Sequence, residues 1–286
     1  MRVGEAGARA LRLGRHTLEL TRPRVMGILN ATPDSFSDGG KFVDRKRALA
    51  RARQMLADGA DIIDVGGEST RPGAAPVSPS DELERVIPIV EALATQGACV
   101  SVDTMKPEVM RAAARAGASM INDVRALQEP GALETIASLD IGVCLMHMQG
   151  TPATMQRAPC YEDVVTQVRC FLIERAQACI DAGIVSERIC IDPGFGFGKT
   201  AAHNLTLLHE LLHIAGAGYP VLVGLSRKSS LGSLTGRDPG DRLGASIAAA
   251  LMAVARGAAI VRVHDVRETV DALKVWHAVE HPPSTG

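Results

Sequence analysis

Val25-Met26-Gly27-Ile28-Leu29-Asn30 is a short apolar run that ends on a polar side chain, and the chain repeats this pattern eight times. Most of the runs are separated by stretches that are rich in Ala and Leu and resemble helices. Apolar strands that alternate with helices are typical of a parallel sheet covered on both faces. The pattern therefore predicts a closed (β/α)8 barrel, the TIM-barrel fold. The polar residues that end the runs are Asn30, Asp64, Asp103, Asn122 with Asp123, His147, Asp192, Ser226, and Arg262 with His264.

The length of the chain fits one such barrel. The chain has 286 residues, and a (β/α)8 barrel needs about 250 as a single domain. We therefore expect one barrel domain over residues 24–286, preceded by an N-terminal extension over residues 1–23. Within the extension, residues 10–20 alternate around Gly14-Arg15 and predict a short β-hairpin. This hairpin would cover the bottom of the barrel.

The predicted elements follow the eight units. Strands are predicted over residues 25–30, 62–65, 99–103, 119–124, 141–147, 188–192, 220–226 and 259–264. Helices are predicted over residues 44–58, 106–116, 132–138, 161–182 and 241–256, from about residue 203, and around Val270, Leu273 and Trp276. A further helix begins after Ser78, because Ser78-Pro79-Ser80-Asp81 supplies an N-cap, a proline in the first turn and an acidic residue.

The carboxyl ends of the strands form the active-site face of a (β/α)8 barrel. The polar residues that end the runs should therefore converge on one pocket, which indicates an enzyme. The loops over residues 31–43 and 66–79 are long, since such connections usually have about 2–6 residues. Long loops on this face are commonly lids or substrate-binding loops.

Composition excludes several other classes of protein. The net charge is −1 and aromatic residues make up only 3% of the chain, which argues against binding to nucleic acid or to a membrane surface. No apolar run reaches the roughly 18 residues of a membrane span. The six cysteines form no CxxC pair, and Cys99, Cys144 and Cys190 fall in predicted strands as small core residues. We expect a cytoplasmic protein with reduced thiols.

Five motifs, in this order and spacing, closely resemble the dihydropteroate synthase family over about residues 24–270. The resemblance implies a (β/α)8 barrel that joins p-aminobenzoate to 6-hydroxymethyl-7,8-dihydropterin diphosphate, with release of diphosphate. It also implies Mg²⁺ beside the diphosphate, sulfonamides in the aminobenzoate position, and, as is frequent in the family, a homodimer. The motifs are Asn30 to Gly40, Asp64 to Gly73, Asp192-Pro193-Gly194-Phe195-Gly196-Phe197-Gly198-Lys199, Ser226-Arg227-Lys228-Ser229, and Arg262-Val263-His264-Asp265.

The resemblance places Asp103, Asn122 and Asp192 on the pterin, with Lys228 donating to the acceptor side of the ring. A pterin edge carries N–H donors and a carbonyl, so carboxylates and an amide are suited to read it. An Asp or Asn at the end of a strand is often only a turn former or a helix cap. Three residues that match the family pattern on three different strands favour the functional interpretation.

The diphosphate requires fixed cations, and Arg262 and His264 lie two residues apart on the last predicted strand, on one face. Arginine offers a planar fork for phosphate oxygens, and a phosphate site near the last strands is common in barrels. The resemblance assigns both residues to the diphosphate and Asn30 to Mg²⁺. It also assigns Thr70 and Arg71 to substrate contacts.

Ser226 and Lys228 lie where the seventh strand turns toward its helix, and the resemblance places them nearest the aminobenzoate. Phe197 would pack on the ring of that ligand, although ordinary loop packing explains it equally well. The expected catalytic residues are Asp103, Lys228, Arg262 and His264. Gly198-Lys199-Thr200 looks like the end of a P-loop, but Pro193 stands where that motif requires glycine.

Three other functions remain open at this point. A methyltetrahydrofolate:corrinoid methyltransferase would share the pterin-reading residues but would not need the Ser226–Lys228 site. A non-catalytic pterin-binding paralogue would lose the diphosphate groups, whereas Asn30, Arg262 and His264 are all present. A phosphate-binding isomerase or aldolase would need a base or a Schiff-base lysine at a strand end, and would leave four motifs unexplained.

Overall fold

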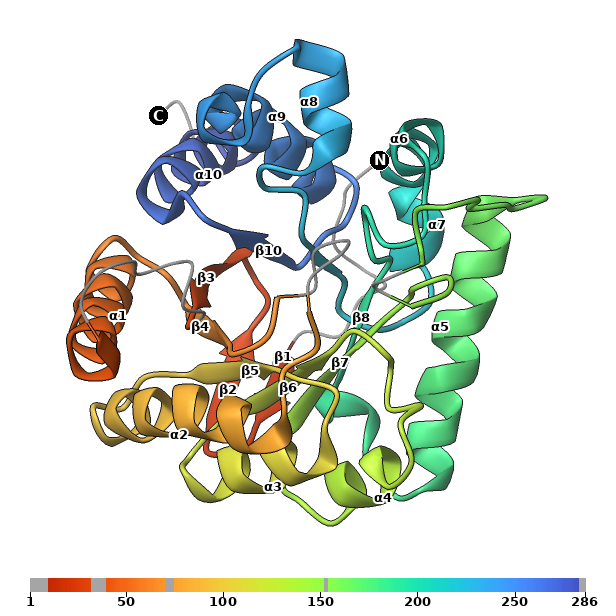
Figure 1. Cartoon of the computed structure of the whole chain (residues 1–286). Helices are drawn as coiled ribbons and strands as arrows, with labels where there is room; N and C mark the ends of the chain where they lie inside the picture. The colour runs from red at the N-terminus through yellow and green to blue at the C-terminus, as the bar shows by residue number, and fades with distance from the viewer. Residues whose placement is uncertain (1–9, 32–39, 70–74, 152–153, 283–286) are drawn as a thin grey trace.

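The structure is a computed structural model that describes residues 10–31, 40–69, 75–151 and 154–282. Eight strands stand side by side in a ring with helices around the outside (Figure 1). Their order is β8-β7-β6-β5-β4-β3-β10-β9, and every neighbouring pair is parallel. The ring closes between β8 and β9 through a parallel bridge of Ile191 to Val221. The predicted (β/α)8 barrel is confirmed.

The strands of the barrel agree with the predicted ranges except near the seventh. That strand was predicted over residues 220–226, but β9 has only two residues. Beyond this strand the backbone turns at Arg227, whose φ is +59°. The strands are β3 Arg24–Asn30, β4 Ile62–Gly66, β5 Val100–Asp103, β6 Met120–Asp123, β7 Gly142–Met146, β8 Ile189–Asp192, β9 Leu222–Val223 and β10 Ile260–Val263.

The helices also follow the predicted order, with two additions. The expected N-cap is present, because the Ser78 hydroxyl accepts from the Asp81 amide at 3.1 Å. Helices α7 and α8 were not predicted; α8 contains three serines and a glycine, which are poor helix formers, so its sequence gives little signal. The helices are α1 Gly40–Ala57, α2 Pro79–Thr95, α3 Pro107–Arg115, α4 Ala132–Ala137, α5 Val164–Asp181, α6 Ala201–His209, α7 Leu211–Ala215, α8 Ser229–Thr235, α9 Leu243–Val254 and α10 Val266–Glu280.

The predicted N-terminal hairpin is present as β1 Ala10–Leu13 and β2 His16–Glu19, an antiparallel pair joined at Gly14. Leu11 and Leu13 are fully buried against the start of the barrel strands. A Cβ on Gly142 would lie 2.3 Å from Leu13 Cδ2, so the hairpin fits tightly against β7. The hairpin therefore covers the amino-terminal end of the barrel, and the carboxyl ends of the strands are left to form the site.

The interior beneath the site is apolar and contains thiols. Cys144 and Cys190 are fully buried in the same cluster as the hairpin leucines, and Cys99 lies at its edge. These three cysteines are core residues, as predicted. Within the described ranges, none of the helices is both long enough and apolar enough to cross a bilayer.

Candidate functional site

Arg262 lies at the centre of a polar cluster at the carboxyl ends of the strands. Its Nε donates to Asp64 Oδ2 at 2.6 Å and its Nη2 donates to Asp103 Oδ2 at 2.9 Å. Asn122 Nδ2 donates to the same oxygen of Asp64 at 3.2 Å. The four side chains come from β10, β4, β5 and β6. The structure thus brings Asp103, Asn122 and Arg262 together, as the sequence predicted.

Two acceptor atoms of this cluster have no hydrogen-bond partner in the part of the chain that the structure describes. Asp64 is fully buried and Asn122 is 4% exposed. Among the described residues, neither Asp64 Oδ1 nor Asn122 Oδ1 receives a hydrogen bond. An unpaired buried acceptor costs about 1–3 kcal/mol, so the cluster is suited to a ligand that supplies N–H donors.

The ion pairs set the charge of the cluster. Burial alone would lower the pKa of Arg262, but the carboxylates of Asp64 and Asp103 outweigh it and raise that pKa further. Burial raises the pKa of Asp103 to about 7, against the opposing effect of Arg262 and with a further contribution from Asp64. Arg262 therefore stays a cation, and Asp103 is poised to change its charge near neutral pH.

Asp192 at the end of β8 begins a second group of site residues. Its Oδ1 accepts from the Gly194 amide at 2.7 Å. Burial raises its pKa to about 6, although that hydrogen bond and the Lys228 and Arg262 cations lower it. Lys228 Nζ lies 4.2 Å from the centre of the buried Phe197 ring. Asp192, Phe197 and Lys228 therefore lie together along one side of the site.

Ser226 and His264 are direct neighbours. Ser226 Oγ lies 3.0 Å from His264 Nδ1 and also accepts from the His264 amide at 3.2 Å. The next residue, Arg227, is held in the left-handed region by its ion pair with Asp265 and by Arg242, which donates to the Arg227 carbonyl at 3.0 Å. The residues predicted to bind aminobenzoate and diphosphate thus meet at this turn.

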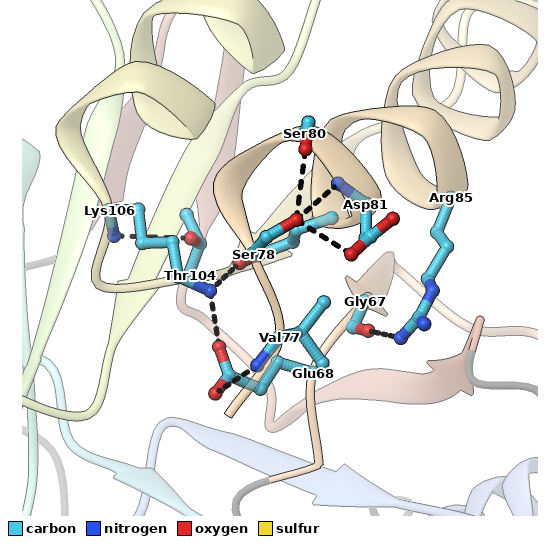
Figure 2. A network of polar contacts seen from close by, with 10 residues as sticks. Gly67, Glu68, Val77, Ser78, Ser80, Asp81, Arg85, Thr104 and Lys106 are labelled. Carbon is cyan, nitrogen blue, oxygen red and sulfur yellow. Dashed lines mark hydrogen bonds and ion pairs between the residues drawn. The ribbon is translucent and has the colours of Figure 1, made fainter. Parts of the chain in front are cut away.

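Hydrogen bonds and ion pairs hold both ends of the loop after β4 (Figure 2). Lys106 Nζ contacts the carboxylates of Glu68 and of the buried Glu82, while Glu68 Oε1 accepts from the Val77 amide at 3.3 Å. Arg85 donates to the Gly67 carbonyl at 2.9 Å. The residues of this loop that were predicted to contact substrate, Thr70 and Arg71, lie outside the described residues.

Comparison with known proteins agrees with this geometry. The family model described as "Pterin binding enzyme" matches residues 26–264. The dihydropteroate synthase of Escherichia coli K12 is 54% identical over 263 residues, which cover 92% of this chain and 93% of that protein.

This chain belongs to the dihydropteroate synthase family. A solved structure of the Xanthomonas albilineans dihydropteroate synthase with 4-aminobenzoic acid matches it with a TM-score of 0.91 at 54% identity, covering 96% of this chain and all (100%) of that one. The Burkholderia cenocepacia enzyme complexed with 7,8-dihydropteroate matches with a TM-score of 0.89 at 54% identity, over 96% of this chain and 98% of that one. The chain is therefore an enzyme, a transferase of the folate pathway.

Membership of this family is consistent with a requirement for a divalent metal. The residue predicted to contact the metal here is Asn30, at the end of β3. Among the described residues, no group of three or more His, Cys, Asp or Glu side chains could hold a metal ion. An amide oxygen is a hard donor, and Mg²⁺ usually keeps several waters and binds substrate phosphates. Asn30 therefore fits a metal that arrives with a diphosphate rather than a metal held by the protein alone.

Three residues near the carboxyl ends of the barrel strands had no predicted role, namely Asp64, Lys106 and Lys199. Asp64 ends an apolar run and begins the second motif, but no role was predicted for it, and it is the closest partner of Arg262. Lys106 lies in no motif that was quoted, and Lys199 was set aside with the failed P-loop. A signal was present for Asp64, because in the sequence it ends an apolar run in the same way as Asp103 and Asp192.

Proposed function

We propose that the protein joins p-aminobenzoate to 6-hydroxymethyl-7,8-dihydropterin diphosphate, forming 7,8-dihydropteroate and diphosphate. The observation that carries this function is the Arg262 cluster, in which one cation, two carboxylates and one amide from four strands meet at the carboxyl end of the barrel. Two buried acceptors of this cluster have no partner among the described residues. The names of the relatives agree with it.

The direct test is incubation with the pterin diphosphate, Mg²⁺ and p-aminobenzoate while diphosphate release is measured. Release that depends on the amine supports a synthase. Equal release without the amine would indicate simple hydrolysis and would contradict the proposal.

The pterin would bind against Asp103, Asn122 and Asp192. Carboxylate and amide oxygens accept from the ring N–H groups, and Asn122 Oδ1 is a buried acceptor without a partner among the described residues. Lys228, beside the Phe197 ring, would donate to the acceptor side of the pterin. Holding the electron-rich ring in this way stabilises positive charge that develops on its methylene carbon.

The diphosphate would be held by Arg262 and His264. Arg262 is anchored by Asp64 and Asp103, and those contacts use only part of its fork of donors. Asn30 would hold Mg²⁺, which when bound neutralises charge on the diphosphate. These groups favour cleavage of the C–O bond, with its electron pair leaving on the diphosphate.

The aminobenzoate would lie between Ser226, Lys228 and Phe197, with Thr70 and Arg71 completing its pocket. Its aromatic amine is neutral at pH 7, so the nitrogen lone pair attacks the methylene carbon without a strong base. The C–O bond breaks first, the C–N bond then forms when the nitrogen captures the methylene cation, and the nitrogen finally loses one proton to water. An S_N1-like ionisation of the pterin diphosphate, followed by capture of the cation, accounts for the absence of a required base.

The domain, the oligomeric state and the location of the protein are part of the same proposal. Residues 24–286 would act as one catalytic domain. A homodimer through the outer helices is supported by exposed apolar residues on the adjacent helices α9 and α10, namely Met252, Val275 and Val279. Light scattering coupled to gel filtration would test it, and a monomer at micromolar concentration would contradict it. A cytoplasmic location stays a prediction.

A further inference from the structure

Lys199 is a buried lysine that the proposed mechanism does not use. It follows the glycine-rich segment 194–198, and only 2% of it is exposed. A buried ammonium group is costly unless hydrogen bonds satisfy it. Its Nζ lies 2.9 Å from His147 Nδ1, 2.9 Å from the Gly194 carbonyl, 3.0 Å from the Phe197 carbonyl and 3.3 Å from the His147 carbonyl.

These acceptors are all neutral, and they come from two separate loops. His147 follows β7, whereas Gly194 and Phe197 lie in the turn after β8. Burial lowers the pKa of His147 to about 3, so its ring is neutral and Nδ1 is able to accept. Burial also lowers the pKa of Lys199 to about 7, and Nζ carries N–H donors in both of its protonation states. Lys199 Nζ thus joins the two loops at the carboxyl end of the barrel.

The backbone of the turn is shaped to enclose this group. Gly194 and Gly198 have φ values of +68° and +62°. A Cβ on Gly194 would lie 1.9 Å from the His147 carbonyl oxygen, and one on Gly198 would lie 2.4 Å from the Gln149 carbonyl oxygen. The turn is therefore pressed against the loop after β7, and its carbonyls converge on Lys199.

The same turn carries two residues of the site. The Gly194 amide donates to Asp192 Oδ1 at 2.7 Å, and the Asp192 carbonyl accepts from the His147 amide at 3.0 Å. Phe197, whose carbonyl accepts from Lys199, presents its ring to Lys228. The turn whose Gly194 and Phe197 carbonyls accept from Lys199 thus also contacts the Asp192 carboxylate and carries the Phe197 ring.

We propose that Lys199 is a positioning residue, whose buried Nζ group fixes the turn that orients the Asp192 carboxylate and the Phe197 ring. The proposal rests on the proposed function, because the two substrates of that function are its readouts. Removing the Nζ group leaves the carbonyls of Gly194 and Phe197 without their donor, so the turn relaxes and both side chains lose their orientation.

The test uses Lys199→Met, which keeps the length of the side chain and removes the donors, and Lys199→Gln, which keeps a shorter neutral donor. The matched control is Arg188→Met. Arg188 is a buried cation at the opposite end of β8, where Nε donates to the Ile141 carbonyl at 2.7 Å and Nη2 to the Ile136 carbonyl at 3.3 Å. Both buried cations are satisfied by carbonyl groups, but only Lys199 borders the site.

Pterin diphosphate affinity is measured by calorimetry in the presence of Mg²⁺, and KM for p-aminobenzoate by diphosphate release, well below each unfolding midpoint. We expect Lys199→Met to weaken both by roughly tenfold or more, because the carbonyls of Gly194 and Phe197 lose their donor. Lys199→Gln should fall between Lys199→Met and the natural protein. Arg188→Met should lower the unfolding midpoint and leave both values within about twofold, since its carbonyls lie at the far end of the barrel. Substrate values within twofold of the natural protein for a folded Lys199 variant overturn the proposal.

A second variant and a second readout keep the test decisive. If Lys199→Met does not fold, the decision falls to Lys199→Gln by the same criterion. Deuterium uptake by the backbone amides of residues 193–198 should rise in the Lys199 variants and not in Arg188→Met, and unchanged uptake contradicts the proposed positioning. If the natural protein shows no amine-dependent diphosphate release, the proposed function fails, while deuterium uptake still decides the role of Lys199.

Discussion

Arg262 on β10 and Asp64 on β4 are joined across the intervening strand β3, with Nε and Oδ2 2.6 Å apart. Asp64 is fully buried, and its carboxylate accepts from Asn122 as well. This one aspartate therefore connects the residue expected to hold diphosphate with a residue expected to read the pterin. The two halves of the substrate would be recognised by one continuous hydrogen-bonded cluster.

Asp64→Asn is expected to impair both halves of this recognition. The variant keeps the shape of the side chain but leaves Arg262 with Asp103 as its only carboxylate in the cluster. Truncating one partner of a buried charge pair costs about 3–5 kcal/mol, and the remaining carboxylate reduces that loss. We expect a lower unfolding midpoint and at least a roughly tenfold fall in kcat/KM for the pterin diphosphate. If a folded Asp64→Asn variant has the same kcat/KM as the natural protein, the ion pair between Arg262 and Asp64 has no functional role.

Arg262→Ala should weaken recognition of the diphosphate much more than recognition of the pterin ring. Binding of the pterin diphosphate should weaken by roughly a hundredfold, because hydrogen bonds to charged groups are among the strongest in proteins. Binding of 6-hydroxymethyl-7,8-dihydropterin, which lacks phosphate, should change much less. Calorimetry with both ligands checks this, and equal losses on the two would count against the assigned role. Thermal unfolding must be measured alongside, because the substitution leaves Asp64 and Asp103 without their cation.

Pterin affinity should depend on pH through Asp192. Burial raises the pKa of this carboxyl to about 6, and only the ionised form accepts from ring N–H groups without donating. The contribution of Asp192 to the affinity should therefore be complete well above pH 6 and should fall by about tenfold for each pH unit well below it. Measurement of the dissociation constant from pH 4.5 to pH 8 would be informative.

Asp192→Asn is the control for this pH dependence. The variant should bind the pterin roughly tenfold to a hundredfold more weakly above pH 6, since an amide cannot accept at both positions. Its affinity should change less with pH than that of the natural protein, and the change that remains reports Asp103, whose pKa burial raises to about 7. Identical pH profiles for the two proteins would remove Asp192 from the site.

The sequence predicted the barrel because each strand is an apolar run with a polar end, and this repetition is visible without any contact being known. It also predicted that Asp103, Asn122 and Arg262 would meet, since the strands of a barrel share one carboxyl edge. It could not predict which partners they choose. The pairing of Arg262 with Asp64 depends on the register of β10, β3 and β4, which is a property of the assembled sheet.

The turn between β9 and α8 was predicted least well, for a physical reason. Arg227 occupies the left-handed region, which a side chain adopts only when surrounding contacts impose it. Those contacts come from Asp265, Ser246 and Arg242, which lie far along the chain from the turn. No local pattern in residues 226–229 encodes this conformation, so the length of β9 and the position of α8 were not apparent.

The same turn gives the last prediction, which concerns Gly232. A Cβ at Gly232 would lie 2.2 Å from Arg242 Nη2, so Gly232→Ala must displace the guanidinium group that donates to the Arg227 carbonyl. Gly244→Ala is the matched control, because a Cβ there meets nothing within 4 Å. Without the Arg242 contact the left-handed conformation of Arg227, which costs about 1–3 kcal/mol, loses part of its support.

Ser226 and Lys228 should then lose their orientation, so KM for p-aminobenzoate should rise by roughly fivefold to tenfold. The affinity for pterin diphosphate should fall less, because Asp103, Asn122 and Asp192 stay in place. Steady-state kinetics with each substrate varied in turn would measure both effects, and a Gly232→Ala profile that matches Gly244→Ala would show that Arg242 does not support the turn.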